Sequence, residues 1–297
     1  MRKKIFKRLA LAIAIGAAGV SASHVALANH AWGSYHWARS TPQFTLKLGN
    51  NLTTSAWTAR LNQSSNDWNA GNTPVLTAIV AGGTSARTCK MVPGTTQVCN
   101  ASYGNNGWLG LAWINLNGDH ITQGTAKMND TYFNTATYTN VNEREHVMCQ
   151  EVAHIFGLGH QSEDGSSQNS CMGDFSNMGE NAGSSVSTKP NAHDFSLLNS
   201  IYSHLDSTST VAAIPGTVGP AAKGGANADI SDDPNSWGAL MKQSANGRAS
   251  TYQRHNDDGS VTLTHVFWTT EAAASCPSCN HGRQYWDSHL ILREACN

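Results

Sequence analysis

A stretch of thirteen residues, CQEVAHIFGLGHQ at 149–161, constrains the fold of this chain more than any other feature. Gln150 and His154 are four positions apart, so on a helix they share one face, one turn apart. Gly157 then provides a helix stop, because glycine readily takes the left-handed conformation at a helix end. A turn there can bring His160 back toward the same face. The spacing therefore predicts a helix, a turn and three converging side chains.

Three converging donors of this kind can hold one zinc ion and leave the fourth tetrahedral position for water, as catalytic zinc sites do. Glu151 adjoins the first donor and can act as general base toward that water. Gln150 offers a neutral amide oxygen, which is a weaker zinc donor than imidazole. We therefore predict one catalytic Zn²⁺, bound by Gln150, His154 and His160, with Glu151 as the catalytic base.

His146 is the other histidine on this predicted helix face, one turn before Gln150. A helix rises about 1.5 Å per residue, so His146 and His154 are about 12 Å apart along the axis. Zinc–nitrogen bonds are roughly 2 Å long, so one ion cannot bridge both rings. We therefore expect His146 to be a helix-surface residue or a residue that supports the ligands.

The run QEVAHIFGLGH resembles the long zinc-binding motif of metzincin metallopeptidases, with Gln150 in place of the first histidine. The resemblance places Met172, in NSCMGDF, in the methionine turn beneath the metal. The segment PNAHDFSLLNSIYSHL at 190–205 is similar to the final helix of matrixin-like members. Asp174 stands where some members carry a metal-binding tyrosine, so no such ligand is carried over. The likeness covers residues 32–206.

This resemblance implies an α+β fold: a metzincin-like catalytic domain with a twisted mixed sheet, an active-site helix, a methionine turn and a C-terminal helix. It implies a secreted zinc endopeptidase that hydrolyses proteins or peptides through a zinc-bound water activated by Glu151. It also assigns TAKMN, at 125–129, to an edge strand that binds extended substrate by strand addition. The alternative is a catalytically inactive, metal-binding pseudopeptidase that acts as a protein-binding module.

The first 28 residues have the organisation of a signal peptide. Five basic residues precede an apolar stretch at 9–20, and Ala26-Leu27-Ala28 fits a small-x-small cleavage site. The apolar stretch is too short for a membrane span, which needs about 20 residues. We therefore expect cleavage near Ala28 and a secreted or periplasmic protein without a membrane anchor in its mature chain.

Removal of that peptide changes the charge balance. It holds five of the 19 basic residues and none of the 20 acidic ones, which leaves 14 basic residues and a formal charge of 14 − 20 = −6. This balance argues against a nucleic-acid partner. A single catalytic zinc is the expected cofactor, and nothing in the sequence supports a structural Ca²⁺. The sequence does not determine the oligomeric state.

Seven cysteines in an exported chain favour disulfides. Cys89 and Cys99 bracket a turn-rich loop, and Cys149 and Cys171 flank the motif region and are the best partners for each other. The C-terminal cysteines are Cys276, Cys279 and Cys296. Together with His281 they could imitate a structural zinc site, but an oxidising compartment favours a disulfide there. Their connectivity stays open, and the odd total leaves one thiol free or paired outside the chain.

Periodicity and turn residues predict the remaining elements. The predicted strands are 32–48, 74–83, 107–118, 122–133 and 260–270, and the predicted helices are 52–69, one from near Asn142, and 192–205. Asn142 can cap the motif helix, and Glu145 can reach back to that cap. The domains are then a signal peptide (1–28), a metzincin-like domain (29–206), a linker (207–236) and a small β-rich, disulfide-containing appendage (237–297).

Overall fold

The structure is a computed structural model and describes residues 30–213 and 231–275. Its strands are β1 (His36–Trp37), β2 (Phe44–Asn51), β3 (Val75–Ala81), β4 (Thr96–Ala101), β5 (Trp108–Asn117), β6 (His120–Asn129), β7 (Ala239–Gln243), β8 (Ala249–His255) and β9 (Val261–Trp268). Its helices are α1 (Ser55–Asn69), α2 (Asp130–Phe133), α3 (Val141–His154), α4 (Ala192–Ile201) and α5 (Thr270–Ala274), with 3₁₀ turns at Gly179–Asn181 and Pro234–Ser236. The predicted α+β class is confirmed.

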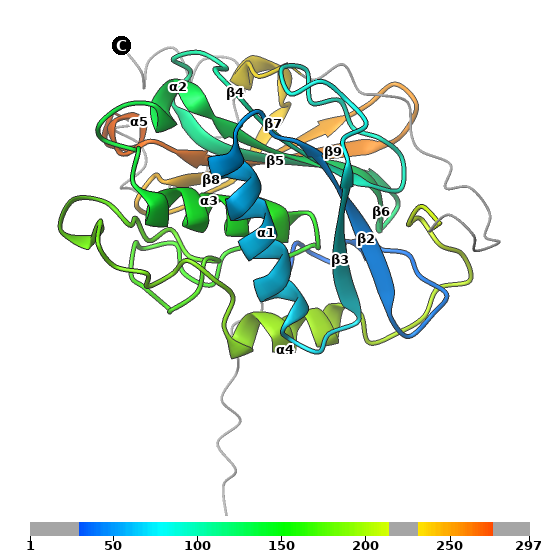
Figure 1. Ribbon diagram of the computed structural model, residues 1–297. Helices are drawn as coiled ribbons and strands as arrows, with labels where there is room; N and C mark the ends of the chain where they lie inside the picture. The colour runs from blue at the N-terminus through cyan, green and yellow to red at the C-terminus, as the bar shows by residue number, and fades with distance from the viewer. Residues whose placement is uncertain (1–29, 214–230, 276–297) are drawn as a thin grey trace, which may run out of the picture.

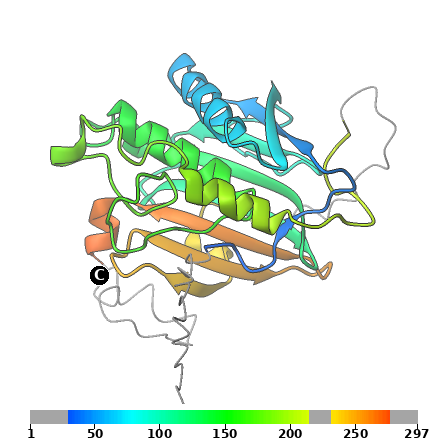
Figure 2. The same ribbon diagram turned by 90° about the horizontal axis from the view of Figure 1, so that it is seen from below.

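All of these strands belong to one twisted mixed sheet, in the order β3-β2-β4-β6-β5-β9-β8-β7, with β1 pairing beside β6 (Figures 1 and 2). Strands β3, β2, β4 and β6 run parallel to one another. Strand β5 reverses direction against β6, and β9, β8 and β7 then alternate in antiparallel pairs. The change from parallel to antiparallel pairing falls next to the motif helix α3.

The outer edge of β5 is occupied by β9, which pairs with it along its whole length from Val261 to Trp268. Figure 2 shows the orange β9 lying beside the green β5. The predicted edge strand at 125–129 is therefore wrong: these residues lie in β6, between β4 and β5. The predicted division at residues 206 and 237 stays a prediction, but the sheet crosses it without a break.

Helices α1 and α3 pack against each other on one face of the sheet (Figure 1). The main hydrophobic core lies beneath them and includes Trp57, Leu61 and Trp68 of α1, which lie in the helix predicted at 52–69. Leu263 and Phe267 of β9 belong to the same core. A smaller cluster, which includes Trp113 of β5 and Trp237, lies apart from it. The C-terminal strands thus share the packing of the whole molecule.

Several element boundaries differ from the predicted ones. The predicted strand at 122–133 ends at Asn129, because the Asn129 side chain accepts a hydrogen bond from Thr131 N and caps α2. The predicted C-terminal helix at 192–205 ends at Ile201. Strand β4 was missed, since its residues lie largely inside the turn-rich segment that the two cysteines bracket. Local turn residues there concealed a strand that pairing with β2 and β6 stabilises.

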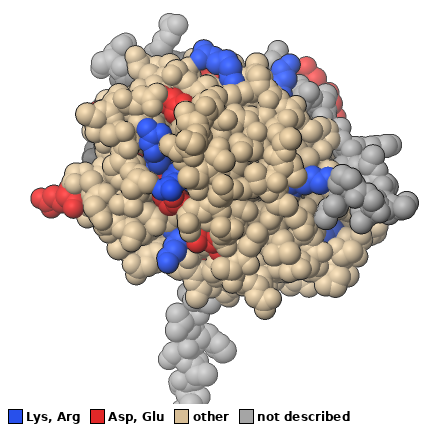
Figure 3. Space-filling model, in the orientation of Figure 1, with Lys and Arg blue, Asp and Glu red and all other residues tan. Residues whose placement is uncertain are grey.

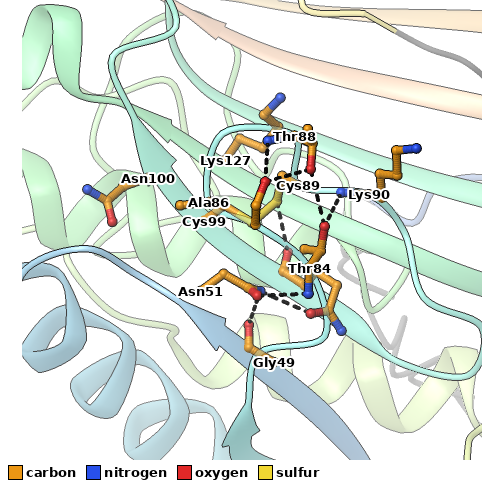
Figure 4. The surroundings of a disulfide bond; sticks show 12 residues. Gly49, Asn51, Thr84, Ala86, Thr88, Cys89, Lys90, Cys99, Asn100 and Lys127 are labelled. Atoms are coloured by element: carbon orange, nitrogen blue, oxygen red, sulfur yellow. Dashed lines mark hydrogen bonds between the residues drawn. A yellow bond between two sulfur atoms is a disulfide. The ribbon is translucent and has the colours of Figure 1, made fainter.

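Two disulfides join the predicted partners, Cys89 with Cys99 and Cys149 with Cys171. Figure 4 shows the first, beside a loop in which Thr84 N donates to Asn51 Oδ1 at 3.1 Å. The second joins α3 to the segment that contains Met172. The signal peptide, its cleavage site and the three C-terminal cysteines lie outside the described residues.

None of the helices in the described ranges combines the length and the hydrophobicity that a bilayer-spanning segment needs. On the face seen in Figure 3, charged side chains are scattered in small groups over a mostly uncharged surface.

Candidate metal centre

Helix α3 carries Gln150, Glu151 and His154, and its N-cap lies two residues earlier than predicted. Its N-cap is Asn140, whose side chain accepts hydrogen bonds from the amides of Asn142 and Glu143. The predicted cap at Asn142, with Glu145 reaching back, is therefore wrong. Glu145 instead pairs with Arg60 of α1, with 3.0 Å between Oε2 and Nε. This ion pair fixes α3 against α1 two turns before His154.

The end of α3 is shaped by Gly157, whose φ of 93° lies in the left-handed region. A Cβ at this position would overlap the backbone oxygen of Tyr35. Trp32 N donates to the Gly157 carbonyl at 2.8 Å, so the N-terminal segment packs against this turn. The predicted helix stop is present, and it returns the chain toward His160.

His154 and His160 face each other with 3.2 Å between their Nε2 atoms. The other ring nitrogen of each histidine is engaged: His154 Nδ1 donates to the Leu158 carbonyl at 2.7 Å, and His160 Nδ1 contacts Asp174 Oδ1 at 2.5 Å. Such partners fix the tautomer and leave Nε2 free to bind a metal. Zinc–nitrogen bonds of about 2.05 Å in a tetrahedron put neighbouring nitrogens about 3.3 Å apart. The observed spacing matches that geometry.

A third imidazole, His265 of β9, completes the cluster. Its ring centroid lies 3.6 Å from that of His154 and 4.5 Å from that of His160. One potential ligand nitrogen from each of the three rings lies within 4.8 Å of the others. Both nitrogens of His265 are buried and have no hydrogen-bond partner. A buried ring without partners calls for an explanation, and a bound ion is one.

Gln150 contacts the turn that contains Met172. Its Nε2 donates to the carbonyl oxygens of Cys171 and Gly173, at 3.0 and 2.9 Å. The amide is therefore oriented by the turn, and its Oε1 is buried without a hydrogen-bond partner. Met172 is fully buried within the turn. The predicted roles of Gln150 as a ligand and of Met172 as the methionine of a metzincin turn stay predictions.

Glu151 is fully buried beside this cluster, and its Oε2 lies 3.7 Å from His265 Nδ1. Neither carboxylate oxygen has a hydrogen-bond partner. Gly110 of β5 leaves the space that the carboxylate occupies, because a Cβ there would overlap Glu151 Oε1. The predicted base is thus held between α3 and the β5–β9 pair.

Burial sets the charge states of this centre. It raises the pKa of the Glu151 carboxyl well above its usual range. It also lowers the pKa of His154 and of His265 well below the usual value, and each is lowered further by neighbouring imidazoles. The two rings are therefore neutral near pH 7, which is the form that binds metal.

The buried atoms of His265 and Glu151 that have no hydrogen-bond partner fit a bound cation and its water. Buried polar groups in folded proteins are normally satisfied. Three imidazoles are a donor set that suits zinc. The residues present at this site therefore fit a zinc ion.

A cavity of about 290 Å³ borders the candidate metal centre on the side of the N-terminal segment and strands β7 and β8. It is lined by His160 and His265, by the N-terminal segment that includes Trp32, and by side chains of β7 and β8 such as Lys242 and Gln253. Trp32 stacks on His154, with 5.2 Å between ring centroids. One side of the centre is thus accessible and lined by mixed polar and aromatic groups.

The structure brings together three of the four predicted site residues, His154, His160 and Glu151. It also shows where sequence reasoning fell short. His146 is fully buried, and its Nδ1 donates to the Ser187 carbonyl at 2.6 Å, so the helix-surface expectation for it is wrong.

Two residues of the centre were missed, His265 and Asp174. His265 takes a position in the alternating series of Leu263 and Phe267, which both face the main core. A histidine in the apolar series of a strand was a usable signal, but nothing in the sequence tied it to α3. For Asp174 no sequence signal indicated a contact with His160.

Comparisons with known proteins add little to this picture. No family profile matches the sequence, and no curated protein does. Among solved structures, the chain is similar to high choriolytic enzyme 1, a hatching-enzyme zinc-protease from the medaka fish Oryzias latipes. The identity is 10%, the TM-score is 0.33, and the match covers 57% of this chain and 95% of that one. A likeness at this level assigns neither a function nor a site residue.

Proposed function

We propose that the chain is a zinc-dependent peptidase whose metal is held by His154, His160 and His265. The observation that carries this proposal is the cluster of three imidazoles with a buried glutamate beside it. His265 takes the place that the sequence assigned to Gln150. Three protein ligands leave a fourth position free, and a zinc ion bound there supplies Lewis acidity and lowers the pKa of water.

The chain's own residues supply the rest of the chemistry. Glu151 of α3 lies 3.7 Å from His265 Nδ1 through its Oε2 and has no hydrogen-bond partner, so it is the group that takes and returns a proton in this proposal. Leu158 and Asp174 hold the two helix-side imidazoles through their Nδ1 atoms. Gln150 acts as a positioning residue, because it fastens α3 to the turn around Met172.

Access to the centre restricts the substrate. Strand addition at β5 is blocked, because β9 already pairs with its outer edge. The cavity of about 290 Å³ is at the small end of ligand sites, which span about 300–1,000 Å³. We therefore propose short peptides or flexible chain ends as substrates. The two disulfides favour an oxidising compartment, which supports the proposed export of the protein.

Zinc content of the purified protein tests the ligand assignment. His154→Ala, His160→Ala and His265→Ala should each lose the zinc of this centre after dialysis against metal-free buffer. Gln150→Ala should retain it, although the fold loses two hydrogen bonds. The reverse pattern, with zinc lost in Gln150→Ala and kept in His265→Ala, would restore the ligand set predicted from sequence.

The role of Glu151 is tested separately from metal binding. Glu151→Gln should retain the zinc and lose activity on a library of short peptides by about 10²–10⁴-fold, the usual contribution of a general acid–base group. Glu143→Gln is a matched control, because Glu143 is also a buried glutamate of α3 but pairs with Arg248 away from the imidazoles. It should change stability more than activity.

A second candidate function is a metal-binding protein without catalysis. The covered edge of β5 is the observation that favours it, because extended substrate cannot add to that strand. A wild-type protein that is fully loaded with zinc yet cleaves nothing in a broad library of short peptides would decide for this reading. Cleavage that Glu151→Gln abolishes would decide for the peptidase.

A further inference from the structure

A second group of imidazoles lies away from the motif helix. It consists of His36 in β1, His120 at the start of β6, and His204 and Asp206 after α4. The register of the sheet explains why His36 and His120 lie side by side, because these two residues are paired directly where β1 runs parallel to β6. No residue of the zinc motif belongs to this group.

The carboxylate of Asp206 is the centre of the group. Its Oδ1 lies 3.4 Å from His36 Nε2, 3.3 Å from His120 Nε2 and 3.6 Å from His204 Nε2. The two nitrogens of His36 and His204 are themselves 3.2 Å apart. The ligand atoms of His36, His120 and Asp206 all lie within 4.8 Å of one another, and His204 lies beside His36 and Asp206 as a fourth, more exposed donor. The distances from Asp206 Oδ1, and the distance between His36 and His204, are close to the separation of about 3.3 Å between neighbouring ligand nitrogens of a tetrahedral zinc ion.

Backbone contacts hold two of these side chains in place. Asp206 Oδ2 accepts a hydrogen bond from Arg39 N at 2.9 Å, and Asp206 N donates to Arg39 O at 2.8 Å. Oδ1 is thereby turned toward the imidazoles. His36 Nδ1 donates to the Ser34 carbonyl at 2.7 Å, so the proton of a neutral ring is on Nδ1 and the lone pair is on Nε2.

A hydrogen-bond network alone explains this arrangement poorly. A single carboxylate oxygen faces three ring nitrogens, and two of those nitrogens face each other at hydrogen-bond distance. Because the proton of a neutral His36 ring is on Nδ1, the lone pair of its Nε2 faces Asp206 Oδ1 at 3.4 Å, and only a second proton on the ring or a bound cation relieves the repulsion between them. Three imidazoles and a carboxylate are a donor set that suits zinc.

We propose that His36, His120, His204 and Asp206 form a second zinc site with a structural role. Four protein donors close the coordination sphere, as in structural sites, and leave no position for a substrate. The site is accessible to metal from solvent, because the side chains of His120 and His204 are 36% and 52% exposed. The proposal does not depend on the first centre being catalytic.

The position of this site indicates what the metal stabilises. It joins three segments that are distant in sequence: β1, the start of β6 and the segment after α4. The same N-terminal segment that carries His36 continues back to Trp32, which stacks on His154. Zinc at the second site therefore anchors the segment that forms one wall of the cavity at the first centre.

Metal stoichiometry and cobalt spectroscopy test the proposal on the full chain. Wild-type protein should contain two zinc ions after dialysis. The double variant His120→Ala/His204→Ala should contain one zinc ion. When both proteins are loaded with cobalt, the double variant should show one of the two sets of four-coordinate d–d absorption bands that the wild-type protein shows. The matched control is His255→Ala, because His255 is an exposed histidine on β8 outside both clusters. It should retain two ions.

A single conservative variant covers the case in which the double variant does not fold. His204→Gln removes one exposed ligand. In a chelator titration, the zinc affinity of one of the two sites should fall by more than roughly 10–100-fold, which is the loss expected when a residue only supports a ligand. Retention of two tightly bound ions in either variant would overturn the second site. Loss of zinc in His265→Ala alone would not bear on it, so failure of the two proposals can be told apart.

Discussion

At the scale of single residues, Gln150 is the position where the role suggested by the sequence motif differs from the contacts seen in the structure. Its place in the motif suggests a ligand, whereas its Nε2 donates to two carbonyl oxygens of the turn around Met172. A glutamine amide has two N–H groups and can satisfy both carbonyls at once. Each nitrogen of a histidine at the same position carries at most one N–H, so neither can donate to both carbonyl oxygens as Gln150 Nε2 does.

We expect Gln150→His to destabilise the protein without tightening zinc binding. One buried carbonyl of the turn loses its donor, which costs about 1–3 kcal/mol in the free energy of unfolding. Denaturant unfolding of the zinc-loaded protein measures the first effect, and chelator competition measures the second. A clear gain in zinc affinity would show that position 150 contacts the metal.

A pH-dependent prediction belongs to Glu145. Burial raises the pKa of its carboxyl to about 7, against the opposing charge of Arg60. The native state therefore binds more protons than the unfolded state between about pH 4.5 and 7, so this group's stabilising contribution is complete at low pH and is lost as the pH rises through 7.

The variant Glu145→Gln should remove that dependence. Relative to wild type, its free energy of unfolding should rise by up to about 3.5 kcal/mol between pH 4.5 and 8, since the shift from 4.5 to about 7 is about 2.5 pKa units and each unit corresponds to about 1.4 kcal/mol. Denaturant titrations of both proteins across this range provide the measurement. A difference that stays constant with pH would contradict the raised pKa.

How far the site could be predicted depends on the distance in sequence between its parts. His154, Glu151 and His160 lie on one helix and the turn after it, where helical spacing alone fixes their relative positions. His265 reaches the centre because β9 pairs with β5. Pairing between strands that are distant in sequence leaves no local periodicity, so the sequence alone did not place His265 beside α3. Asp174 reaches His160 through a loop, whose path no residue pattern dictates.

At the scale of elements, the contact between α3 and β5 controls where Glu151 lies. Gly110 belongs to β5 and pairs with Met128 of β6 and Phe267 of β9. It leaves room for both Val147 and Glu151 of α3. A side chain at this position must displace either the helix or the carboxylate.

We therefore expect Gly110→Ala to lower the free energy of unfolding by about 1–3 kcal/mol, the usual cost of overpacking a core. It should also reduce peptidase activity while zinc stays bound, because Glu151 moves and the imidazoles do not. Ala112→Gly, on the same strand and the same face, is the control: it opens space without touching Glu151. Equal losses of activity in both variants would contradict a specific effect on the carboxylate.

The elements with strong periodicity were predicted well, and those that depend on partners were not. Helix α1 and strands β3, β5 and β9 follow the apolar patterns of their segments. Strand β4 has no such pattern and is stabilised by neighbours on both sides. The order of the strands could not be read at all, since pairing of β9 with β5 depends on the whole sheet.

At the scale of the whole molecule, removal of zinc from the first centre should loosen the attachment of β9 to α3. We expect the metal-free protein to exchange the amide hydrogens of β7–β9 faster than the zinc-loaded protein, with less change in β2 and β3. Zinc should also stabilise the fold by about 2.7 kcal/mol at 100 times its dissociation constant. Hydrogen exchange with and without chelator measures both the place and the size of the effect.

In that experiment, strands β7–β9 of His265→Ala should respond little to chelator, because the first centre of this variant no longer binds metal. Uniformly faster exchange across all strands of the wild-type protein would contradict a local link between α3 and β9.

The pairing of β9 with β5 also sets a sequence of events during biosynthesis. His154 and His160 leave the ribosome, and cross the membrane if the chain is exported, well before His265 does. A metal centre that needs all three is incomplete until the last strands have closed the sheet. If the proposed centre binds zinc, the metal is acquired as a late step, after the disulfide between Cys149 and Cys171 has had time to form, and a chain whose last strands have not yet paired would be inactive as a peptidase.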